Sequence, residues 1–188
     1  RISAEGSKPE AITTVGTNEV GHFWPRFLPD GRHYLFLLKS AQASTSGVYV
    51  ASLDSKERTR LLPVETNAVY TDPGYLVFKR ESAVYAQRFS ADKLALAGEP
   101  VRVADEVTFE SERGHGDFDV SRNGVLIYHA NSANAVASGE GAWEFQLQWA
   151  DRGAQPIEAV GPYGFYRGVE LSPDGRRVAV HRHDGSGG

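Results

Sequence analysis

The sequence contains neither cysteine nor methionine in its 188 residues. The lack of cysteine excludes disulfides, thiolate nucleophiles and cysteine-ligated zinc, and it fits an oxidising compartment as well as a reducing one. Methionine is missing even at position 1. We therefore expect a segment cut from a longer protein, with any signal peptide or membrane anchor lying outside it.

The sequence also lacks long apolar runs and any strong excess of charge of one sign. The densest apolar stretch, residues 34–38, falls far short of the ~20 residues that a membrane helix needs, so we expect no membrane contact by this segment. The 20 basic and 24 acidic side chains are interspersed and give a net charge of −4. No basic face is available for a phosphate backbone, which argues against nucleic acid as a partner. No cofactor is indicated.

Glycine, proline and aromatic residues are well represented. The chain has 20 glycines, nine prolines and 11% aromatic residues, with few stretches that favour helix, and this composition is typical of an all-β protein. With 40% hydrophobic residues, a chain of this length can bury a substantial core as a single domain.

A hairpin pattern recurs four times along the chain: a short strand, a turn that ends in glycine, and a second strand. The repeats cover residues 24–38, 68–79, 118–129 and 169–181, with turn glycines Gly31, Gly74, Gly124 and Gly175 at spacings of 43, 50 and 51 residues. Glycine accepts positive φ, and a neighbouring Asp or Asn can accept hydrogen bonds from turn N–H groups. We interpret the polar turn residues as structural rather than as a carboxylate constellation: Asp30, Asp72, Asn123 and Asp174.

A third and a fourth strand follow each of the first three hairpins. The expected third strands are residues 47–53, 83–89 and 145–151, and the expected fourth strands are 58–64, 99–105 and 155–160. Residues 90–98 are interpreted as an extended loop. Four antiparallel strands in a repeat of 43 to 51 residues predict the blade of a β-propeller.

The two ends of the sequence each hold half a repeat. Residues 1–6 match residues 50–55 and residues 10–15 match a fourth strand, whereas the C-terminal segment holds the first two strands. We expect about four blades, with Ile2 and Ala4 pairing beside Val178–His181 in a shared blade. The expected divisions of this single domain are 1–15, 16–66, 67–115, 116–165 and 166–188. The alternative is an arc of a larger propeller, and both a monomer and an end-swapped dimer fit the pattern.

The hairpins "FLPDGRHYLF" and "LSPDGRRVAV" and the strand "GVYVASLDS" resemble the WD40-like, or PD40, repeats of TolB-type propellers. More narrowly, most of the chain is similar to the propeller half of bacterial transmembrane serine/threonine kinases. The resemblance implies an extracytoplasmic or periplasmic sensing domain whose parent carries the kinase domain elsewhere. The kinase signature itself is absent, since there is no glycine-rich phosphate loop, no H-R-D loop and no D-F-G.

The search for catalytic chemistry in the sequence yields no candidate. No G-x-S-x-G elbow is present. The alternating pair His181 and His183, with Asp184, is interpreted as a solvated strand end rather than a metal site. We predict a non-catalytic binding, sensing or protein-interaction module for a protein or small-molecule ligand. Two alternatives are enzymes: the propeller portion of a prolyl-oligopeptidase-like hydrolase, or a propeller enzyme with an unrecognised site at its mouth. A third alternative is a chain made to study how propellers assemble, with no ligand of its own.

Binding residues are expected on the face opposite the short turns, because the long connections of an alternating-strand repeat emerge there. These segments are residues 16–23, 40–46, 105–117, 131–142 and 161–167. Function concentrates in loops carried by a rigid scaffold. The candidates are Phe109, Glu110, Glu112, Arg113, His115, Tyr163, Phe165 and Tyr166. The alternative is that they are solvated connections with a few anchoring aromatics.

Overall fold

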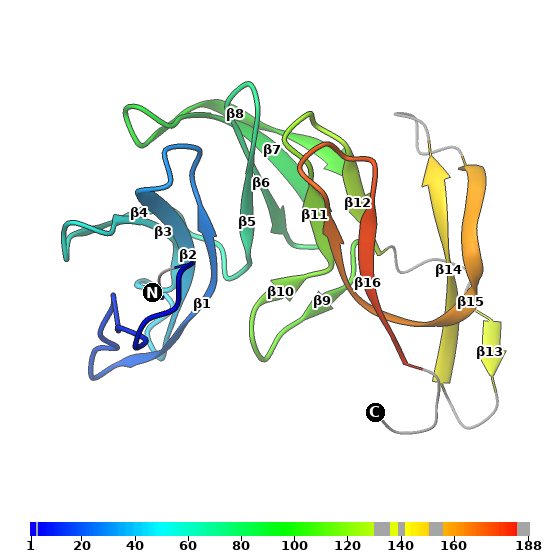
Figure 1. The fold of residues 1–188 in the computed structure, drawn as a ribbon, viewed down its shortest axis with the longest axis horizontal. Coiled ribbons are helices and arrows are strands. Elements are labelled where there is room, and N and C mark those ends of the chain that lie inside the picture. The colour runs from blue at the N-terminus through cyan, green and yellow to red at the C-terminus, as the bar shows by residue number, and fades with distance from the viewer. Residues whose placement is uncertain (3, 130–135, 139–141, 151–155, 184–188) are drawn as a thin grey trace.

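The computed structural model describes residues 1–2, 4–129, 136–138, 142–150 and 156–183, and this part of the chain is all β, as expected. Its strands form small antiparallel sheets that stand side by side in a fan (Figure 1). Within these residues the sheets form neither a closed barrel nor a closed ring. The same residues contain no helix that is long and apolar enough to cross a membrane.

Two complete sheets of four strands confirm the first two expected repeats. The first sheet contains β1 (Glu19–Phe27), β2 (His33–Ser40), β3 (Gly47–Ser52) and β4 (Arg58–Leu62), in that order. The second sheet contains β5 (Ala68–Thr71), β6 (Tyr75–Arg80), β7 (Ala83–Ser90) and β8 (Ala95–Ala104), again in sequence order. Two expected loops are corrected, because residues 19–23 belong to β1 and residues 95–98 belong to β8.

Within the described residues, the third expected repeat does not form a sheet of its own. Its first hairpin is a two-stranded sheet, β11 (Phe118–Val120) with β12 (Leu126–Tyr128). The last sheet contains β13 (Val136–Ser138), β14 (Ala142–Ala150), β15 (Pro156–Leu171) and β16 (Val178–His183). The 16-residue β15 pairs with β14 along its first half and with β16 along its second. Residues 161–167, expected as a loop, are therefore strand.

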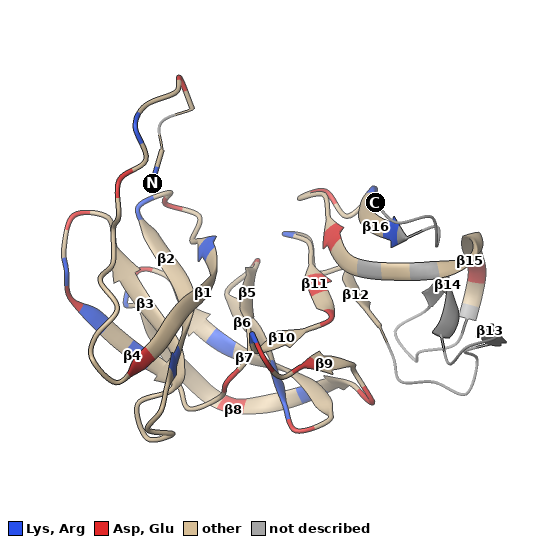
Figure 2. Ribbon diagram, turned by 90° about the horizontal axis from the view of Figure 1, so that it is seen from below, with Lys and Arg blue, Asp and Glu red and all other residues tan. Residues whose placement is uncertain are grey.

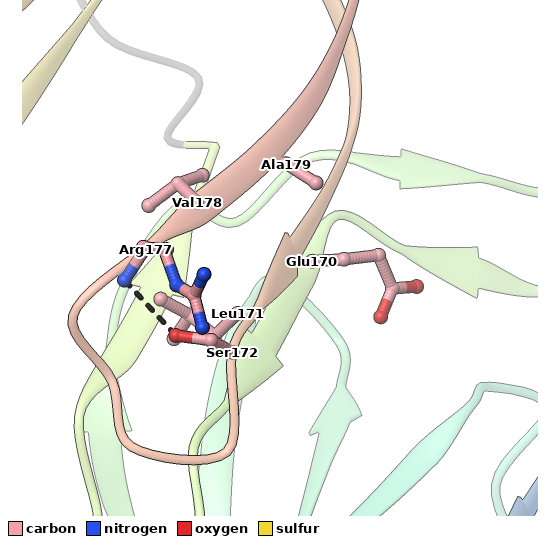
Figure 3. A pocket seen from close by; sticks show the side chains of 6 residues that line it. All are labelled: Glu170, Leu171, Ser172, Arg177, Val178 and Ala179. Carbon is pink, nitrogen blue, oxygen red and sulfur yellow. Dashed lines mark hydrogen bonds between the residues drawn. The ribbon is translucent and has the colours of Figure 1, made fainter.

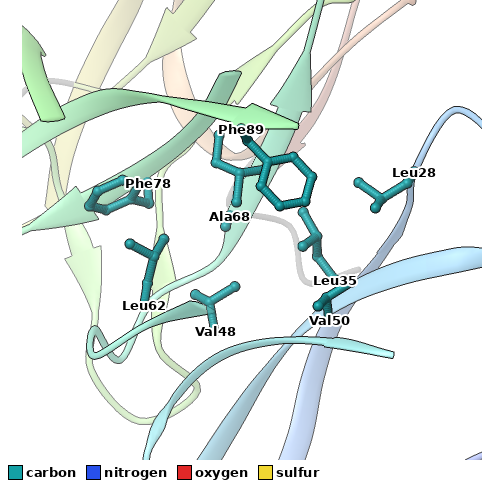
Figure 4. Packing of buried hydrophobic residues seen from close by; sticks show 9 residues of the cluster. Leu28, Leu35, Val48, Val50, Leu62, Ala68, Phe78 and Phe89 are labelled. Atoms are coloured by element: carbon teal, nitrogen blue, oxygen red, sulfur yellow. The ribbon is translucent and has the colours of Figure 1, made fainter. Parts of the chain in front are cut away.

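Two hydrophobic clusters lie between successive units. One cluster joins the facing sides of the first and second sheets (Figure 4), and its members are Leu28, Leu35, Val48, Val50, Leu62, Ala68, Leu76, Phe78 and Phe89. A second cluster joins the other side of the second sheet to the β11–β12 hairpin through residues such as Val77, Val84 and Phe118. The second sheet is thus buried on both faces, and removal of this apolar surface from water holds the row of units together.

The turns of neighbouring repeats are joined by hydrogen bonds. Thr71 Oγ1 donates to the Ser121 carbonyl at 2.7 Å, and the Asp72 N–H donates to the Arg122 carbonyl at 3.1 Å. The Arg122 N–H in turn donates to the Pro173 carbonyl at 3.1 Å. Units that follow one another in sequence are therefore also neighbours in space.

The turn glycines have the expected positive φ, which is 64° at Gly31, 116° at Gly74, 85° at Gly124 and 67° at Gly175. The turn aspartates also act structurally. Asp30 Oδ1 accepts hydrogen bonds from two backbone N–H groups at 2.9 Å, and Asp174 Oδ1 accepts one from Arg176 at 3.1 Å.

The first and last turns offer a matched test of the contact between units. A Cβ at Gly31 would meet nothing within 4 Å, whereas one at Gly175 would lie 2.9 Å from Asn123 Oδ1. We expect Gly31→Ala to cost about 1 kcal/mol of unfolding free energy through its positive φ alone. Gly175→Ala is expected to cost about 1 kcal/mol more, because its Cβ also crowds the neighbouring turn. Urea unfolding measures both values, and equal losses would show that the two turns do not touch.

The N-terminal segment does not pair with β16, which corrects the expected shared blade. The backbones of Arg1 and Glu10 bond to each other, and Ile12 packs on the outer side of the first sheet. Within the described residues β16 pairs only with β15. The N-terminus lies by the first sheet, and the second sheet stands between the first sheet and β16 in both views (Figures 1 and 2).

Glu19 secures this segment at the start of β1. Its carboxylate accepts hydrogen bonds from the Gly16 N–H at 2.7 Å and from the Arg58 guanidinium, and it lies 3.1 Å from His22 Nε2. Burial alone would raise the pKa of Glu19, but these partners outweigh it and lower the pKa from 4.5 to about 2. The charged form is therefore favoured in the folded state.

The lowered pKa of Glu19 predicts a pH dependence. Its contribution to stability is fully present above pH 4.5 and is lost as the pH falls toward 2, because the folded state must then take up a proton at an unfavourable site. The difference in unfolding free energy between the unsubstituted chain and Glu19→Gln should narrow across that range. Denaturant titrations at several pH values measure this difference in unfolding free energy. A constant difference for Glu19→Gln would contradict the assignment.

Candidate functional site

A short hairpin inside the expected loop 105–117 collects most of the candidate residues. β9 (Phe109–Glu110) pairs with β10 (His115–Gly116) in a two-stranded sheet of its own. Five of the eight candidates lie on this hairpin, namely Phe109, Glu110, Glu112, Arg113 and His115. The structure therefore brings these five together, and residues 109–116 are called the β9–β10 hairpin below.

The first sheet holds the tip of the β9–β10 hairpin by its backbone. Lys39 Nζ donates to the carbonyls of Ser111 and Glu112 at 2.7 and 2.9 Å, and Trp24 Nε1 donates to the Arg113 carbonyl at 2.9 Å. Trp24 lies where the pairing of β1 with β2 shifts register, and such an irregularity re-aims a side chain. These contacts link residues 72 to 89 positions apart in the sequence.

Asn67, just before the second sheet, holds the base of the hairpin. This buried side chain accepts a hydrogen bond from the Gly116 N–H at 2.8 Å and donates to the Gly116 carbonyl at 3.3 Å. The Asn67 N–H donates to the Gly114 carbonyl at 3.1 Å. A Cβ at Gly114 would come within 2.4 Å of Leu37 Cδ2, so only glycine permits the hairpin to approach this closely.

The side chains of the hairpin tip remain in solvent while its backbone is fixed. Glu112 and Arg113 are exposed, and so is Glu110, whose carboxylate accepts a hydrogen bond from the Arg113 N–H at 3.1 Å. Phe109 is 42% exposed, with Lys79 Nζ 4.8 Å from its ring centroid. The hairpin thus presents an aromatic ring and charges of both signs on a rigid support.

His115 is oriented by Asp117. Its Nδ1 lies 3.2 Å from Asp117 Oδ1, and its ring packs on Trp24 with 4.3 Å between centroids. Thr108 Oγ1 donates to the other carboxylate oxygen of Asp117 at 2.7 Å. Burial alone would raise the pKa of Asp117, but hydrogen bonds from His115, His129 and Thr108 hold that pKa well below its usual range. The carboxylate is therefore charged at neutral pH and fixes the imidazole against Trp24.

The other three candidates lie elsewhere, on β15. Tyr163 is 44% exposed, and its carbonyl accepts a hydrogen bond from Arg182 Nη2 at 3.3 Å. The half-buried Tyr166 donates its hydroxyl to the Pro162 carbonyl at 2.7 Å. The side chain of Phe165 lies outside the described part of the structure, as does most of segment 131–142. These residues are placed by a strand rather than by a loop, and they form a separate group from the hairpin.

A charged cluster that sequence reasoning missed lies where three units converge. Arg26 Nη2 of β1 contacts both carboxylate oxygens of Glu170 at 2.7 and 2.6 Å and lies 3.7 Å from Asp119 Oδ1. The Asp119 side chain is only 4% exposed, and its Oδ2 accepts a hydrogen bond from the Leu171 N–H at 2.7 Å. Burial, supported by the charge of Glu170, raises the pKa of Asp119. The cluster borders a hollow of about 150 Å³ that Tyr70 also lines.

The repeat pattern contained a signal for this cluster. All three residues stand five positions before a turn glycine, at the same place in the first strand of their repeats. In the second repeat this position is the apolar Val69. The charged residues therefore do not recur in every repeat, and a search for local motifs does not find them.

Among the described residues no group of three or more acidic, histidine or cysteine side chains could hold a metal ion. The sequence candidate at residues 181–184 lies partly outside them, since Asp184 is not described. Comparison of the chain with protein families, with curated proteins and with solved structures finds no match. The resemblance of its hairpins to PD40 repeats therefore rests on the residues themselves.

Proposed function

We propose that this chain is the propeller portion of a longer bacterial protein, such as a receptor-type serine/threonine kinase, and that it acts outside the cytoplasm as a non-catalytic binding, sensing or protein-interaction module. The propeller assignment is supported by the two four-stranded sheets, which are buried against neighbours, and by the hydrogen bonds between successive turns. First strands from three repeats also converge at Arg26, Asp119 and Glu170, as the inner strands of propeller blades do.

The observation that carries the binding role is the β9–β10 hairpin. Its backbone is fixed by Lys39, Trp24 and Asn67, whereas Glu112 and Arg113 remain exposed. A surface that is already ordered loses little conformational entropy when it binds, which favours affinity and specificity. Packing of the core does not explain why a hairpin with so firmly fixed a backbone carries exposed side chains of both charges.

A thermal-shift screen of the isolated chain tests this function. The probes are amino acids, short peptides and simple sugars at millimolar concentration. A ligand should raise the melting temperature of the chain, and the doubly substituted Glu112→Ala/Arg113→Ala should lose that shift. The control is Lys56→Ala/Glu57→Ala in the exposed β3–β4 turn, which should keep it. Turnover of peptide, glycoside or lactone substrates by the purified chain would contradict a non-catalytic module.

A further inference from the structure

All four repeats border one hollow beside Asp119, with a volume of about 150 Å³. Each first strand contributes to its wall, through Arg26 of β1, Tyr70 of β5, Asp119 of β11 and Leu171 of β15. None of the described residues that line the hollow belongs to the β9–β10 hairpin. The hollow is therefore a separate place in the fold from the binding site proposed above.

The ion pairs beside the hollow leave one negative charge without a countercharge. Asp119 and Glu170 share the guanidinium of Arg26, whose Nη2 lies 3.7 Å from Asp119 Oδ1 and 2.6 Å from Glu170 Oε2. Within the described residues no other basic side chain pairs with either carboxylate. Arg122, which lines the hollow from an exposed turn, is among those that do not pair.

Arg177, on the same hairpin as Glu170, does not neutralise that carboxylate either. Figure 3 shows this hairpin, whose labelled side chains line a neighbouring hollow of about 390 Å³. The Arg177 side chain lies by Ser172, to which its backbone N–H donates a hydrogen bond at 3.0 Å, whereas the Glu170 carboxylate extends the other way (Figure 3). Glu170 is thus directed away from Arg177, and its carboxylate contacts Arg26.

Asp119 is the buried member of the two carboxylates. Its side chain is 4% exposed, and its Oδ2 accepts the hydrogen bond from the Leu171 N–H at 2.7 Å. At Oδ1 the Arg26 guanidinium lies beyond hydrogen-bond distance. Burial disfavours the charged form of Asp119, the charge of Glu170 adds to this effect, and the pKa of Asp119 is raised. A cation at Oδ1 would relieve both effects.

Apolar side chains form much of the remaining wall. Val69, Val120 and Leu171 line the hollow together with the ring of Tyr70. Phe27 lines it as well and is 59% exposed. Aromatic rings attract cations to their faces. A cavity of ~150 Å³ accepts a molecule the size of benzene, and n-butylamine is similar in size. The hollow therefore suits a short alkyl chain that ends in a positive charge.

We propose that this hollow binds a primary alkylammonium group, with the ammonium beside Asp119 and the alkyl chain against the apolar wall. The ligand supplies the missing countercharge, and it gives Asp119 Oδ1 the close donor that Arg26, at 3.7 Å, does not. Two sources share this chemistry, namely a free small amine and the lysine side chain of a partner protein. The site is independent of the β9–β10 hairpin, and either can exist without the other.

NMR titration of the isotopically labelled chain with n-butylamine at neutral pH tests the site. The signal of the Leu171 N–H, which donates to Asp119 Oδ2, should shift, whereas that of the Gly116 N–H on the β9–β10 hairpin should not. We expect n-butylamine to bind about ten-fold more tightly than the uncharged n-butanol. Nα-acetyl-lysine methylamide identifies the source. An affinity equal to that of n-butylamine indicates a lysine side chain, and a much weaker affinity indicates a free amine.

Glu170→Gln removes one of the two negative charges without disturbing the core, since this side chain is 55% exposed. It should weaken the binding of n-butylamine several-fold. The control Glu110→Gln changes the net charge equally but lies on the β9–β10 hairpin, so it should leave the affinity unchanged. Absence of a Leu171 shift, equal binding of n-butanol, or equal losses for the two variants would overturn the proposal. Tighter binding of butyrate would overturn it too, because it would indicate an anion site at Arg122.

Discussion

Replacement of Arg26 by alanine is expected to lower the free energy of unfolding by about 3 kcal/mol, because it leaves a buried carboxylate without its countercharge. The Asp119 side chain is 4% exposed and lies 3.7 Å from the Arg26 guanidinium. Glu170, whose carboxylate contacts the same Arg26 Nη2, would then lie near Asp119 without a neutralising charge. Equilibrium unfolding in urea at neutral pH measures the loss.

The control for this variant is Arg32→Ala. Arg32 pairs with Asp54, but both side chains are more than half exposed, at 62% and 57%. Exposed pairs contribute roughly 0–1 kcal/mol, so Arg32→Ala should change stability little. Similar losses for the two variants would contradict the role assigned to the buried cluster.

Replacement of Asn67 by alanine is expected to cost about 2–3 kcal/mol and to loosen the β9–β10 hairpin. The substitution removes both hydrogen bonds between the Asn67 side chain and Gly116. It leaves the buried N–H of Gly116 without an acceptor. Urea unfolding gives the free energy, and hydrogen exchange of the Gly116 amide should become faster than the global loss of stability explains.

The exposed Asn18 offers a matched control, since its contacts run through its backbone carbonyl rather than its side chain. Asn18→Ala should leave both the stability and the Gly116 exchange rate nearly unchanged. If Asn67→Ala slowed or preserved the exchange of Gly116, the hairpin would not depend on this anchor.

The hairpins were predictable because their determinants are local. Asp-Gly and Asn-Gly turns between apolar strands specify strand, turn and strand within about 12 residues. The positive φ of Gly31 and Gly175 and the strands on either side of them follow that pattern. The all-β class follows from the same repeats.

The last sheet was not predictable in this way, because long-range pairing decides it. The stretch 161–168 contains three glycines and a proline, which normally indicate a loop. It is nevertheless strand, since β14 pairs with one half of β15 and β16 with the other.

The candidate site was likewise predictable only where its determinants are local. Exposed charged residues on a long connection identified the β9–β10 hairpin. Its anchors were missed because Trp24, Lys39 and Asn67 stand in or beside strands of other units, 49 to 89 residues away. Such polar contacts leave no periodic signal in a sequence.

The central claim is that the row of units curves so that the first strands of its two ends meet. The contact between Arg26 of β1 and Glu170 of β15, which lie 144 residues apart, is the most direct expression of that curvature. It is measured by a double-mutant cycle of Arg26→Ala, Glu170→Ala and the double variant, each unfolded in urea. Because both side chains are partly exposed, we predict a coupling energy of about 1 kcal/mol. Effects that add to within about 0.3 kcal/mol would show that the two residues do not touch and would contradict the curved arrangement.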